Sequence, residues 1–338
     1  MSPPDAGDGA GDGIDPFADE LPREYPSAAD VLAAIADETG PIPFADLPAL
    51  SSPDDATTGR AFALWGTLTP NRRRDFLAAL QQLSDEDATL DFERIQLSAL
   101  RDPDTATRIL AIRGLWESER PEYAAVLLDI AGDDAEAAVR AAASEGLGSF
   151  VVGNEFGMLP VEIGERLLET LRDRVEDFTE EDEVRGSALS AVGASSEEWV
   201  AELIAEQYET GSTRMRRAAV EAMGRHGSDD WLPVLIQTFE DDDEDVRAAA
   251  AISAGNLLLE AAVEPLTLLL EDEEEEVQVA AIRALGEIAG DRAEQILQDL
   301  LRSPEPHIAA AAELAADEAR MMSVDLEGEA PLPWTAEQ

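Results

Sequence analysis

The sequence predicts an all-α fold in which helical repeats stack into a right-handed α-α superhelix, or solenoid. One helical phrase occurs seven times between residues 107 and 317. Its opening residue, which we call the anchor, recurs every 31 residues from Val184 to Ile308. The fourth residue after every anchor is alanine. A fixed period in this range indicates stacked helical units that bury one another's apolar faces.

The copies are defined by three kinds of residue. The anchors are Thr107, Val139, Val184, Met215, Val246, Val277 and Ile308. The alanines are Ala111, Ala143, Ala188, Ala219, Ala250, Ala281 and Ala312. Nine residues after five of the anchors stand Gly148, Gly193, Gly224, Gly255 and Gly286. We expect these glycines to adopt the left-handed conformation that follows many helix C-termini.

Each repeat is predicted to contain two helices, which we call the first and the second helix. A first helix is illustrated by residues 229–240, where apolar residues recur at helical spacing. The second helix of the same repeat spans residues 245–256 and carries the anchor Val246 and Ala250 on one stripe. The small alanines allow the paired helices to approach closely.

Four regions are predicted along the chain. Residues 1–26 are rich in Gly, Asp and Pro and indicate a disordered acidic tail. Residues 27–100 indicate an atypical helical N-terminal cap, which the exposed end of a solenoid needs. The repeat array occupies residues 101–320, and residues 321–338 form a loose C-terminal tail.

The cap region contains several helical signals. Ser27 is the expected N-cap of a first helix that stops at Gly40. Prolines between residues 41 and 53 indicate a linker. Amphipathic segments follow at 55–68, at 71–83 after an Asn71 cap, and at 89–100.

One repeat carries an insertion. The spacing from Val139 to Val184 is 45 residues, which is 14 more than the period of 31. We expect the extra residues to form a loop near 149–160, because insertions in repeat proteins map to loops and often to a binding face. The candidate partner-binding residues are Phe150, Asn154, Phe156 and Met158. The alternative is that this loop packs against its own repeat.

The charge is strongly negative. The 24 basic residues, all arginine, face 74 acidic residues, which gives a formal net charge of −50. With 45% hydrophobic residues the chain is predicted to be folded. This combination favours the salt-rich cytoplasm of halophilic archaea, where molar salt screens repulsion within a few ångströms. The alternative is an acidic protein of an ordinary cytosol that binds a basic partner.

Several function classes are disfavoured by composition. A negative surface opposes direct binding of nucleic acid or of anionic lipid. The chain has no cysteine, and it has no apolar run of the ~20 residues that cross a bilayer. The N-terminus does not resemble a signal peptide. We therefore expect a cytoplasmic protein whose partners are proteins.

No catalytic residue, cofactor site or metal site is predicted. The acidic runs 240–245 and 271–276 lack the glycine and the final glutamate of a calcium loop, so we interpret them as solvated turns that begin the second helices. The two histidines, His226 and His307, are interpreted as exposed residues between helices.

The repeated phrase resembles the HEAT repeat, and in particular the short HEAT-like repeats also found in phycocyanobilin lyases. The resemblance covers about two thirds of the chain and is carried by VRAAASEGLG (139–148), VRGSALSAVG (184–193), MRRAAVEAMG (215–224), VRAAAAISAG (246–255) and VQVAAIRALG (277–286). It implies that the second helices line a concave face. It also implies an Asp–Arg ladder between repeats through Arg108, Arg140, Arg185, Arg216 and Arg247.

The ladder is expected to fail at Gln278 and Ala309, which replace arginine. We expect its acidic partners to be residues such as Asp134 and Asp241, which stand six residues before Arg140 and Arg247. An anionic ligand along these arginines is the alternative. Structural pairing is favoured because an arginine fork matches a carboxylate.

The predicted function is a non-catalytic protein-interaction scaffold or adaptor. The alternative suggested by the resemblance is a lyase-like enzyme, or enzyme subunit, acting on a tetrapyrrole- or bilin-modified partner. Deoxyhypusine hydroxylase, another protein of HEAT-like repeats, holds iron with His-Glu pairs. Here Gly227 follows His226 and Ile308 follows His307, so the resemblance does not extend to that site.

The charge makes folding dependent on salt. Removal of molar KCl restores repulsion among about fifty uncompensated negative charges and should abolish the helical circular dichroism signal. The measurement is a salt titration followed at 222 nm. Full helicity in low-salt buffer would contradict the prediction of a salt-adapted protein.

Overall fold

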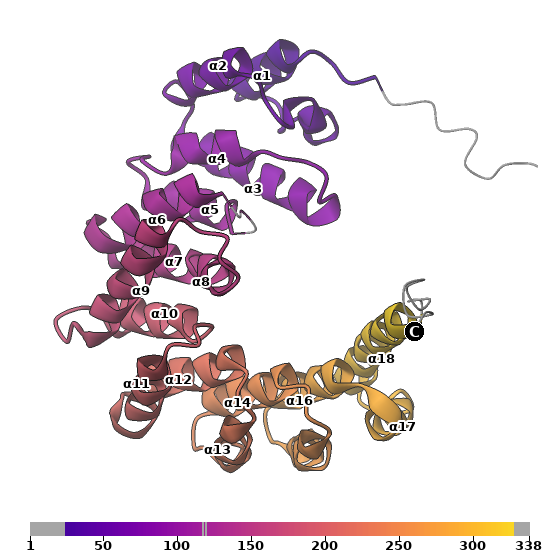
Figure 1. The fold of residues 1–338 in the computed structure, drawn as a ribbon. Helices are drawn as coiled ribbons and strands as arrows, with labels where there is room; N and C mark the ends of the chain where they lie inside the picture. The colour runs from indigo at the N-terminus through magenta and orange to yellow at the C-terminus, as the bar shows by residue number, and fades with distance from the viewer. Residues whose placement is uncertain (1–23, 117, 119, 328–338) are drawn as a thin grey trace, which may run out of the picture. The chain divides into compact units, whose positions relative to one another are not determined.

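The structure is a computed structural model that describes residues 24–116, 118 and 120–327, with side chains described as far as Arg320. These residues form eighteen α-helices and four short 3-10 helices, and they contain no strand (Figure 1). The all-α prediction is therefore confirmed. The predicted acidic tail lies almost wholly outside the described residues, as does the end of the C-terminal tail. The chain divides into two compact units, Met1–Ile95 and Gln96–Gln338, which we treat separately.

The first unit contains α1 (Ala28–Ala36), the 3-10 helix η1 (Phe44–Leu50), α2 (Asp55–Trp65), α3 (Pro70–Glu86) and the start of α4 (Glu93–Ala99). The Ser27 hydroxyl accepts a hydrogen bond from Asp30 N at 3.2 Å, which confirms the predicted N-cap. The expected linker between residues 41 and 53 is instead largely helical, because η1 buries Leu47 and Leu50 completely.

Arg72 of α3 connects that helix to the end of α1 and to the residues that follow α1. Its buried guanidinium donates to the backbone carbonyls of Ile35, Asp37 and Gly40 at 2.9–3.0 Å, and so satisfies acceptors that the end of α1 leaves free. The cap of α3 is Thr69 rather than the predicted Asn71, because Pro70 already occupies the first helical turn.

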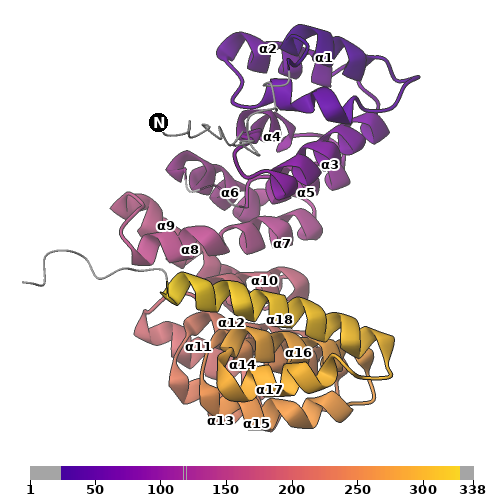
Figure 2. The same cartoon turned by 90° about the vertical axis from the view of Figure 1, so that its right-hand side faces the viewer.

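The second unit consists of two rows of helices (Figures 1 and 2). The second helices contact one another in sequence order. They are α5 (Thr105–Arg113), α7 (Ala137–Gly146), α10 (Asp182–Val192), α12 (Thr213–His226), α14 (Glu244–Asn256), α16 (Glu275–Ile288) and α18 (Pro306–Glu327). The last of them extends seven residues beyond the predicted end of the array at residue 320.

Six first helices each pack against the second helix that follows. They are α6 (Pro121–Asp133), α9 (Val161–Glu176), α11 (Glu198–Thr210), α13 (Leu232–Thr238), α15 (Val263–Leu266) and α17 (Gly290–Leu300). Three 3-10 segments extend α13 and α15: η2 (Asp229–Trp231), η3 (Glu260–Ala262) and η4 (Thr267–Glu271). The remaining helix, α8 (Gly148–Glu155), belongs to the insertion.

The second helices pack through a stripe of small residues. All seven repeat alanines have no exposed surface. The interior glycines lie against the next second helix, and a Cβ on Gly224 would stand 2.8 Å from the Cα of Ser253. Gly193, Gly255 and Gly286 face Ala222, Ala284 and Ala315 in the same way, at 2.7–2.8 Å. These four glycines admit the neighbouring backbone, which no side chain would allow.

The predicted left-handed role of these glycines is therefore wrong. Gly193 has a φ of −54°, and Gly224, Gly255 and Gly286 lie inside helices. Among the described glycines, positive φ occurs at Gly157, Gly227 and Gly290. Gly227, three residues after Gly224, is the left-handed residue that ends α12.

Arginines of the second helices contact the turn before the next second helix. Arg247 donates two hydrogen bonds to the carboxylate of Asp272, at 2.8 and 2.9 Å, and we call such a contact a rung. Arg216 binds Asp241 by the same pair of nitrogens at 2.9 and 3.1 Å. Arg108 binds Asp134 at 2.9 Å. Each rung therefore joins two consecutive repeats.

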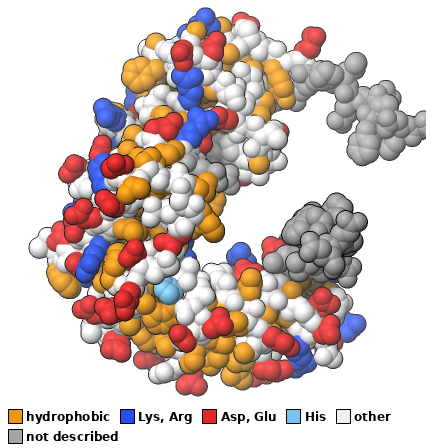
Figure 3. All heavy atoms as spheres, viewed as in Figure 1, with side chains coloured by type: hydrophobic (Ala, Val, Ile, Leu, Met, Phe, Trp, Pro, Cys, Tyr) orange, Lys and Arg blue, Asp and Glu red, His pale blue; other side chains and the backbone are white. Residues whose placement is uncertain are grey.

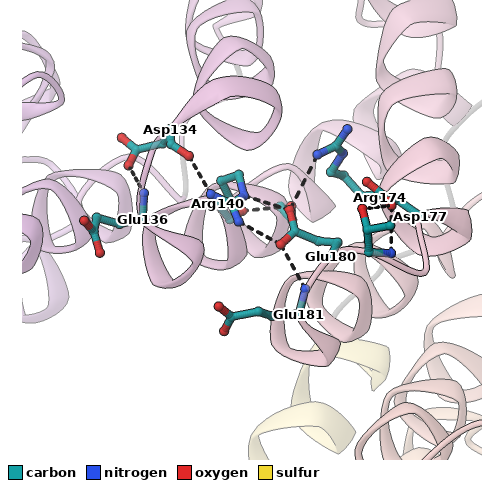
Figure 4. Close-up of polar contacts among 9 residues, drawn as sticks. Asp134, Glu136, Arg140, Arg174, Asp177, Glu180 and Glu181 are labelled. Atoms are coloured by element: carbon teal, nitrogen blue, oxygen red, sulfur yellow. Dashed lines mark hydrogen bonds and ion pairs between the residues drawn. The ribbon is translucent and has the colours of Figure 1, made fainter.

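The rung at Arg140 is drawn in Figure 4. Its guanidinium donates to both oxygens of Glu180, at 2.7 and 2.8 Å, and Arg174 lies 3.5 Å from the same carboxylate. Hydrogen bonding by Arg140 holds the pKa of Glu180 below its ordinary value. Arg140 also donates to the backbone carbonyl of Asp134 at 2.6 Å.

The expected pairing of each arginine with the carboxylate six residues earlier is wrong. Arg140 and Arg247 bind only the backbone carbonyl of that aspartate. The side chain of Asp241 turns the other way, because it accepts from the backbone N–H of Asp243 and from Arg216 of the preceding repeat. One aspartate thus shapes its own turn and also joins two repeats.

The rungs change where the sequence changes. Gly211 and Ser212 directly precede the next second helix, so Arg185 finds no carboxylate there. It binds Val175 O at 3.0 Å and Asp182 at 2.9 Å within its own repeat, and Gln207 of the next repeat at 3.5 Å. Gln278, where failure was expected, keeps the carbonyl bond to Asp272 at 2.7 Å and contacts His307 at 2.7 Å. A contact between an amide and an imidazole replaces the arginine–carboxylate pair at that junction.

Close helix packing predicts a contrast between two glycines. Replacement of Gly224 by alanine should lower the free energy of unfolding by about 1–3 kcal/mol, because the new methyl group must displace the backbone around Ser253. A Cβ on Gly132 in α6 would have no neighbouring atom within 4 Å, so Gly132→Ala should be neutral or stabilising by up to about 1 kcal/mol. Urea unfolding at constant salt measures both. Equal effects would contradict the packing role.

A rung should contribute measurably to stability. Arg247→Ala leaves Asp272 mostly buried without its donor and should cost about 1–3 kcal/mol. The exposed pair of Arg302 and Asp299 provides the control, and Arg302→Ala should change little.

Arg247 lowers the pKa of Asp272, so the rung stabilises the fold above the ordinary aspartate pKa of about 3.9, and this stabilisation is lost as pH falls through the lowered value. The effect of Arg247→Ala should therefore shrink in acid.

Candidate functional site

A hollow of about 420 Å³ opens on the face of the second helices. All of its lining belongs to α7, α10, α12 and α14 or to the residue directly before them. The hollow exists because the residues of α10 and α12 at its floor are small: Gly186, Ser187, Ser190, Ala191 and Ala218. The hollow therefore spans the junction of α10 and α12, where Arg185 makes no rung.

Charged side chains of both signs line the hollow. The acids are Glu145, Glu183, Glu221, Asp243 and Asp245, and the bases are Arg214, Arg217 and Arg225. Arg217 contacts Glu221 at 3.0 Å and Asp245 at 3.3 Å, and Arg214 lies 3.5 Å from Glu183. Arg225 makes no hydrogen bond or ion pair with another described residue. Such a lining can bind a polypeptide that carries both signs of charge.

The insertion forms a helix rather than the predicted loop. Its helix α8 packs against α7, α9 and α10, with Phe150 and Val151 buried. Buried apolar residues at its start explain why the segment folds although its sequence is rich in Gly and Asn. The chain then reverses at Gly157, whose φ is +68°.

The four predicted partner-binding residues have different environments. Phe150 is buried in the repeat, which is the alternative that the sequence left open. Asn154 packs so closely against α9 that a Cβ on Gly164 would collide with its Oδ1. Phe156 and Met158 are 78% and 47% exposed. Only these two of the four are available to a partner.

Two further residues share this exposed surface. Val152 precedes Phe156 by one helical turn and is 44% exposed, and Val161 at the start of α9 is 69% exposed. We call Val152, Phe156, Met158 and Val161 the insertion patch. Figure 3 shows hydrophobic side chains gathered over the part of the second unit where Figure 1 places α8.

The insertion is fixed at the edge of the hollow. Arg225 Nη1 lies 3.1 Å from the position of a Cβ on Gly148, the first residue of α8. At the other end of α8, Glu155 accepts hydrogen bonds from Ser195 and Ser196. Burial acts to raise the pKa of Glu155, but these hydrogen bonds outweigh it and hold the pKa below its ordinary value. The carboxylate therefore stays charged and anchors the helix.

A signal for the hollow is present in the sequence, although the repeat pattern does not reveal it. Helix α12 carries four of the 24 arginines within 14 residues, and one of them, Arg216, is used in a rung. The other three line the hollow. An arginine cluster on one second helix of so acidic a chain indicates a local requirement for positive charge.

Two further titratable groups have shifted pKa values because they are partly buried. Burial lowers the pKa of His226, which meets Trp231 edge-on at 6.0 Å. Burial, with help from Glu318, raises the pKa of Glu287. No group of three or more acidic or histidine side chains is placed to hold a metal ion in this part of the chain. Asp241 and Asp272 of the acidic runs form rungs. The expectation that these runs are solvated turns is therefore wrong for these two residues.

Aromatic residues near the first helices lie in different environments. Tyr123 is buried, whereas Trp199 is half-buried beneath the guanidinium of Arg172 at 4.8 Å. Trp116 is 59% exposed. None of the described helices is both long enough and apolar enough to span a membrane.

Solved structures with the same type of fold have low sequence identity to this chain. The complex of CpcE and CpcF of phycocyanin lyase from Nostoc is 16% identical, with a TM-score of 0.48, over 80% of this chain and 97% of that chain. Human deoxyhypusine hydroxylase in complex with glycerol is 19% identical, with a TM-score of 0.36, over 87% and 96%. The Escherichia coli YibA protein is 16% identical, with a TM-score of 0.42, over 89% and 99%.

A comparison with curated protein sequences found no match. The HEAT-repeat family matches three overlapping segments, residues 94–193, 165–255 and 232–317. Together these segments span residues 94–317, which is well over half of the 338-residue chain. They contain all seven second-helix anchors. The chain therefore belongs to the family of HEAT-repeat proteins.

Proposed function

We propose that this protein is a non-catalytic scaffold or adaptor that binds a protein partner through its second-helix face and the insertion patch. The observation that carries the proposal is the position of α8. An inserted helix begins next to Arg225 of the charged hollow, is held at its other end by Glu155, and ends at the exposed residues Phe156 and Met158. Apolar and ionic contacts are thus available side by side, as in the core and rim of protein interfaces.

The two surfaces contribute different contacts. The hollow offers carboxylates and guanidinium groups that fix the orientation of a polar segment. The insertion patch supplies an aromatic and a methionine side chain, which contribute most when they are desolvated in an interface. The close contact of Gly193 with Ala222 holds α10 and α12 in a defined register, so the partner meets a preorganised surface.

The proposed setting is a cytoplasm with molar salt. Screening under those conditions weakens long-range attraction and leaves contact with apolar surface as the main source of affinity. The exposed Phe156 and Met158 suit this requirement. The partner is a protein, and neither nucleic acid nor a membrane surface matches the charge of −50.

Affinity capture at molar salt tests the proposal. The full chain is the bait, and its partners are identified by mass spectrometry and quantified. We expect one or two stoichiometric partners, with binding reduced about tenfold or more by Arg217→Ala/Arg225→Ala in the hollow or by Phe156→Ser in the patch. The control is Leu268→Ser, which changes a 72% exposed leucine on a first-helix segment.

Two results would contradict the adaptor. One is that the wild type and all variants capture every partner in equal amounts. The other is turnover or a visible absorption band on incubation of the purified protein with a bilin and an acceptor protein, which would favour the lyase-like alternative.

A further inference from the structure

The insertion patch is larger than the packing of its repeat requires. Phe150, Val151 and Leu159 already fill the interface between α8 and the neighbouring helices, with at most 8% of their surface exposed. The patch residues lie outside that core. The exposed surface of Phe156 and Met158 is not buried by folding, so the free energy of burying it is available to a partner.

The patch residues lie close to one another. Phe156 N donates to Val152 O at 3.3 Å, which places these side chains one turn apart on the same face of α8. Met158 N donates to Gly153 O at 2.9 Å, and the Met158 sulfur lies 4.0 Å from the position of a Cβ on Gly153. Reversal at Gly157 therefore brings Met158 back alongside α8.

Exposed acids accompany the patch. Glu155 precedes Phe156 and is held by two serines, and Glu162 and Glu165 follow Val161 on the first two turns of α9. The arginine in those turns, Arg166, is ion-paired with Asp129. The electrostatic environment of the patch is thus negative, and an occupant with positive charge around an apolar stripe would complement it.

Two other occupants fit less well. In a second copy of this chain the same acids would face each other, and four side chains fall far short of the roughly 800 Å² per subunit that a stable interface buries. The N-terminal segment 1–22 contains acidic residues but no basic residue. Charge complementarity therefore favours a different protein.

We propose that the insertion patch binds the apolar face of a basic amphipathic helix on the partner protein. This inference rests on the proposed adaptor function and specifies its partner. The apolar residues of that helix, spaced by three or four positions, pack on Val152, Phe156 and Met158. Its lysine or arginine side chains lie next to Glu155, Glu162 and Glu165. The flexible thioether of Met158 adapts to side chains of different shape.

A fluorescein-labelled peptide tests the proposal directly. The probe is an 18-residue helical peptide, a length of about five turns, with leucine and phenylalanine on one face and lysine on the other. Control peptides have the same composition in scrambled order, or glutamate in place of lysine. Fluorescence anisotropy is recorded with the full chain at molar KCl and at the lowest salt that preserves its helicity.

The wild-type chain should bind the basic amphipathic peptide, and Phe156→Ser/Met158→Ser should weaken binding about tenfold or more. Leu258→Ser/Leu268→Ser, which alters two residues that are 56% and 72% exposed elsewhere, should have no effect. The scrambled and acidic peptides should bind at least tenfold more weakly. Lower salt should strengthen binding of the basic amphipathic peptide and weaken binding of the acidic peptide.

Equal affinity of the patch variant and the wild type, or of the basic and acidic peptides, would overturn the proposal. So would a concentration-dependent dimer of the wild type that is lost in Phe156→Ser/Met158→Ser, because the occupant would then be a second copy. If captured partners are lost only in the hollow variant Arg217→Ala/Arg225→Ala, this proposal fails while the adaptor function stands.

Discussion

Consecutive second helices approach so closely that a side chain at the contact is excluded. Gly193, Gly224, Gly255 and Gly286 each face the backbone of the next second helix, and a methyl group on any of them would lie within 2.8 Å of it. This contact fixes the distance between repeats. It also brings Arg216 and Arg247 within reach of the following turn, where they bind Asp241 and Asp272, each 25 residues further along the chain. The first helices then pack outside this row, where their larger apolar residues find space.

The few arginines of this acidic chain have specific places. Four of them form rungs whose carboxylates also complete backbone turns, as Asp241 and Asp272 do. Arg72 closes the end of α1 by binding five backbone carbonyls between residues 34 and 41. Three more line the hollow beside α8. These eight of the 24 arginines therefore join structural elements or line the hollow.

The sequence predicted those features that depend on local pattern. The second helices, the burial of the alanine after each anchor and the Ser27 cap follow from helical periodicity and capping chemistry, and the structure confirms them. The role of the glycines was mistaken, because a glycine near a helix end serves either a left-handed turn or a close neighbour. Only the neighbouring helix distinguishes the two, as at Gly224 and Gly227.

The candidate site shows the same limit. Periodicity located the insertion, but a loop was expected because insertions in repeat proteins usually form loops, whereas tertiary packing of Phe150 and Val151 produces a helix here. The hollow arises from residues of four helices, so the arginine cluster of α12 indicates a need for positive charge but not the shape of the hollow.

Hydroxyl-radical footprinting of the protein with its captured partner tests the central claim most directly, because it reports the solvent access of individual side chains. The account predicts that Phe156 and Met158 lose reactivity in the complex while Phe178, which is equally exposed at 78%, keeps its own. Unchanged oxidation of Phe156 and Met158, with protection confined to Phe178 or to the first helices, would contradict it.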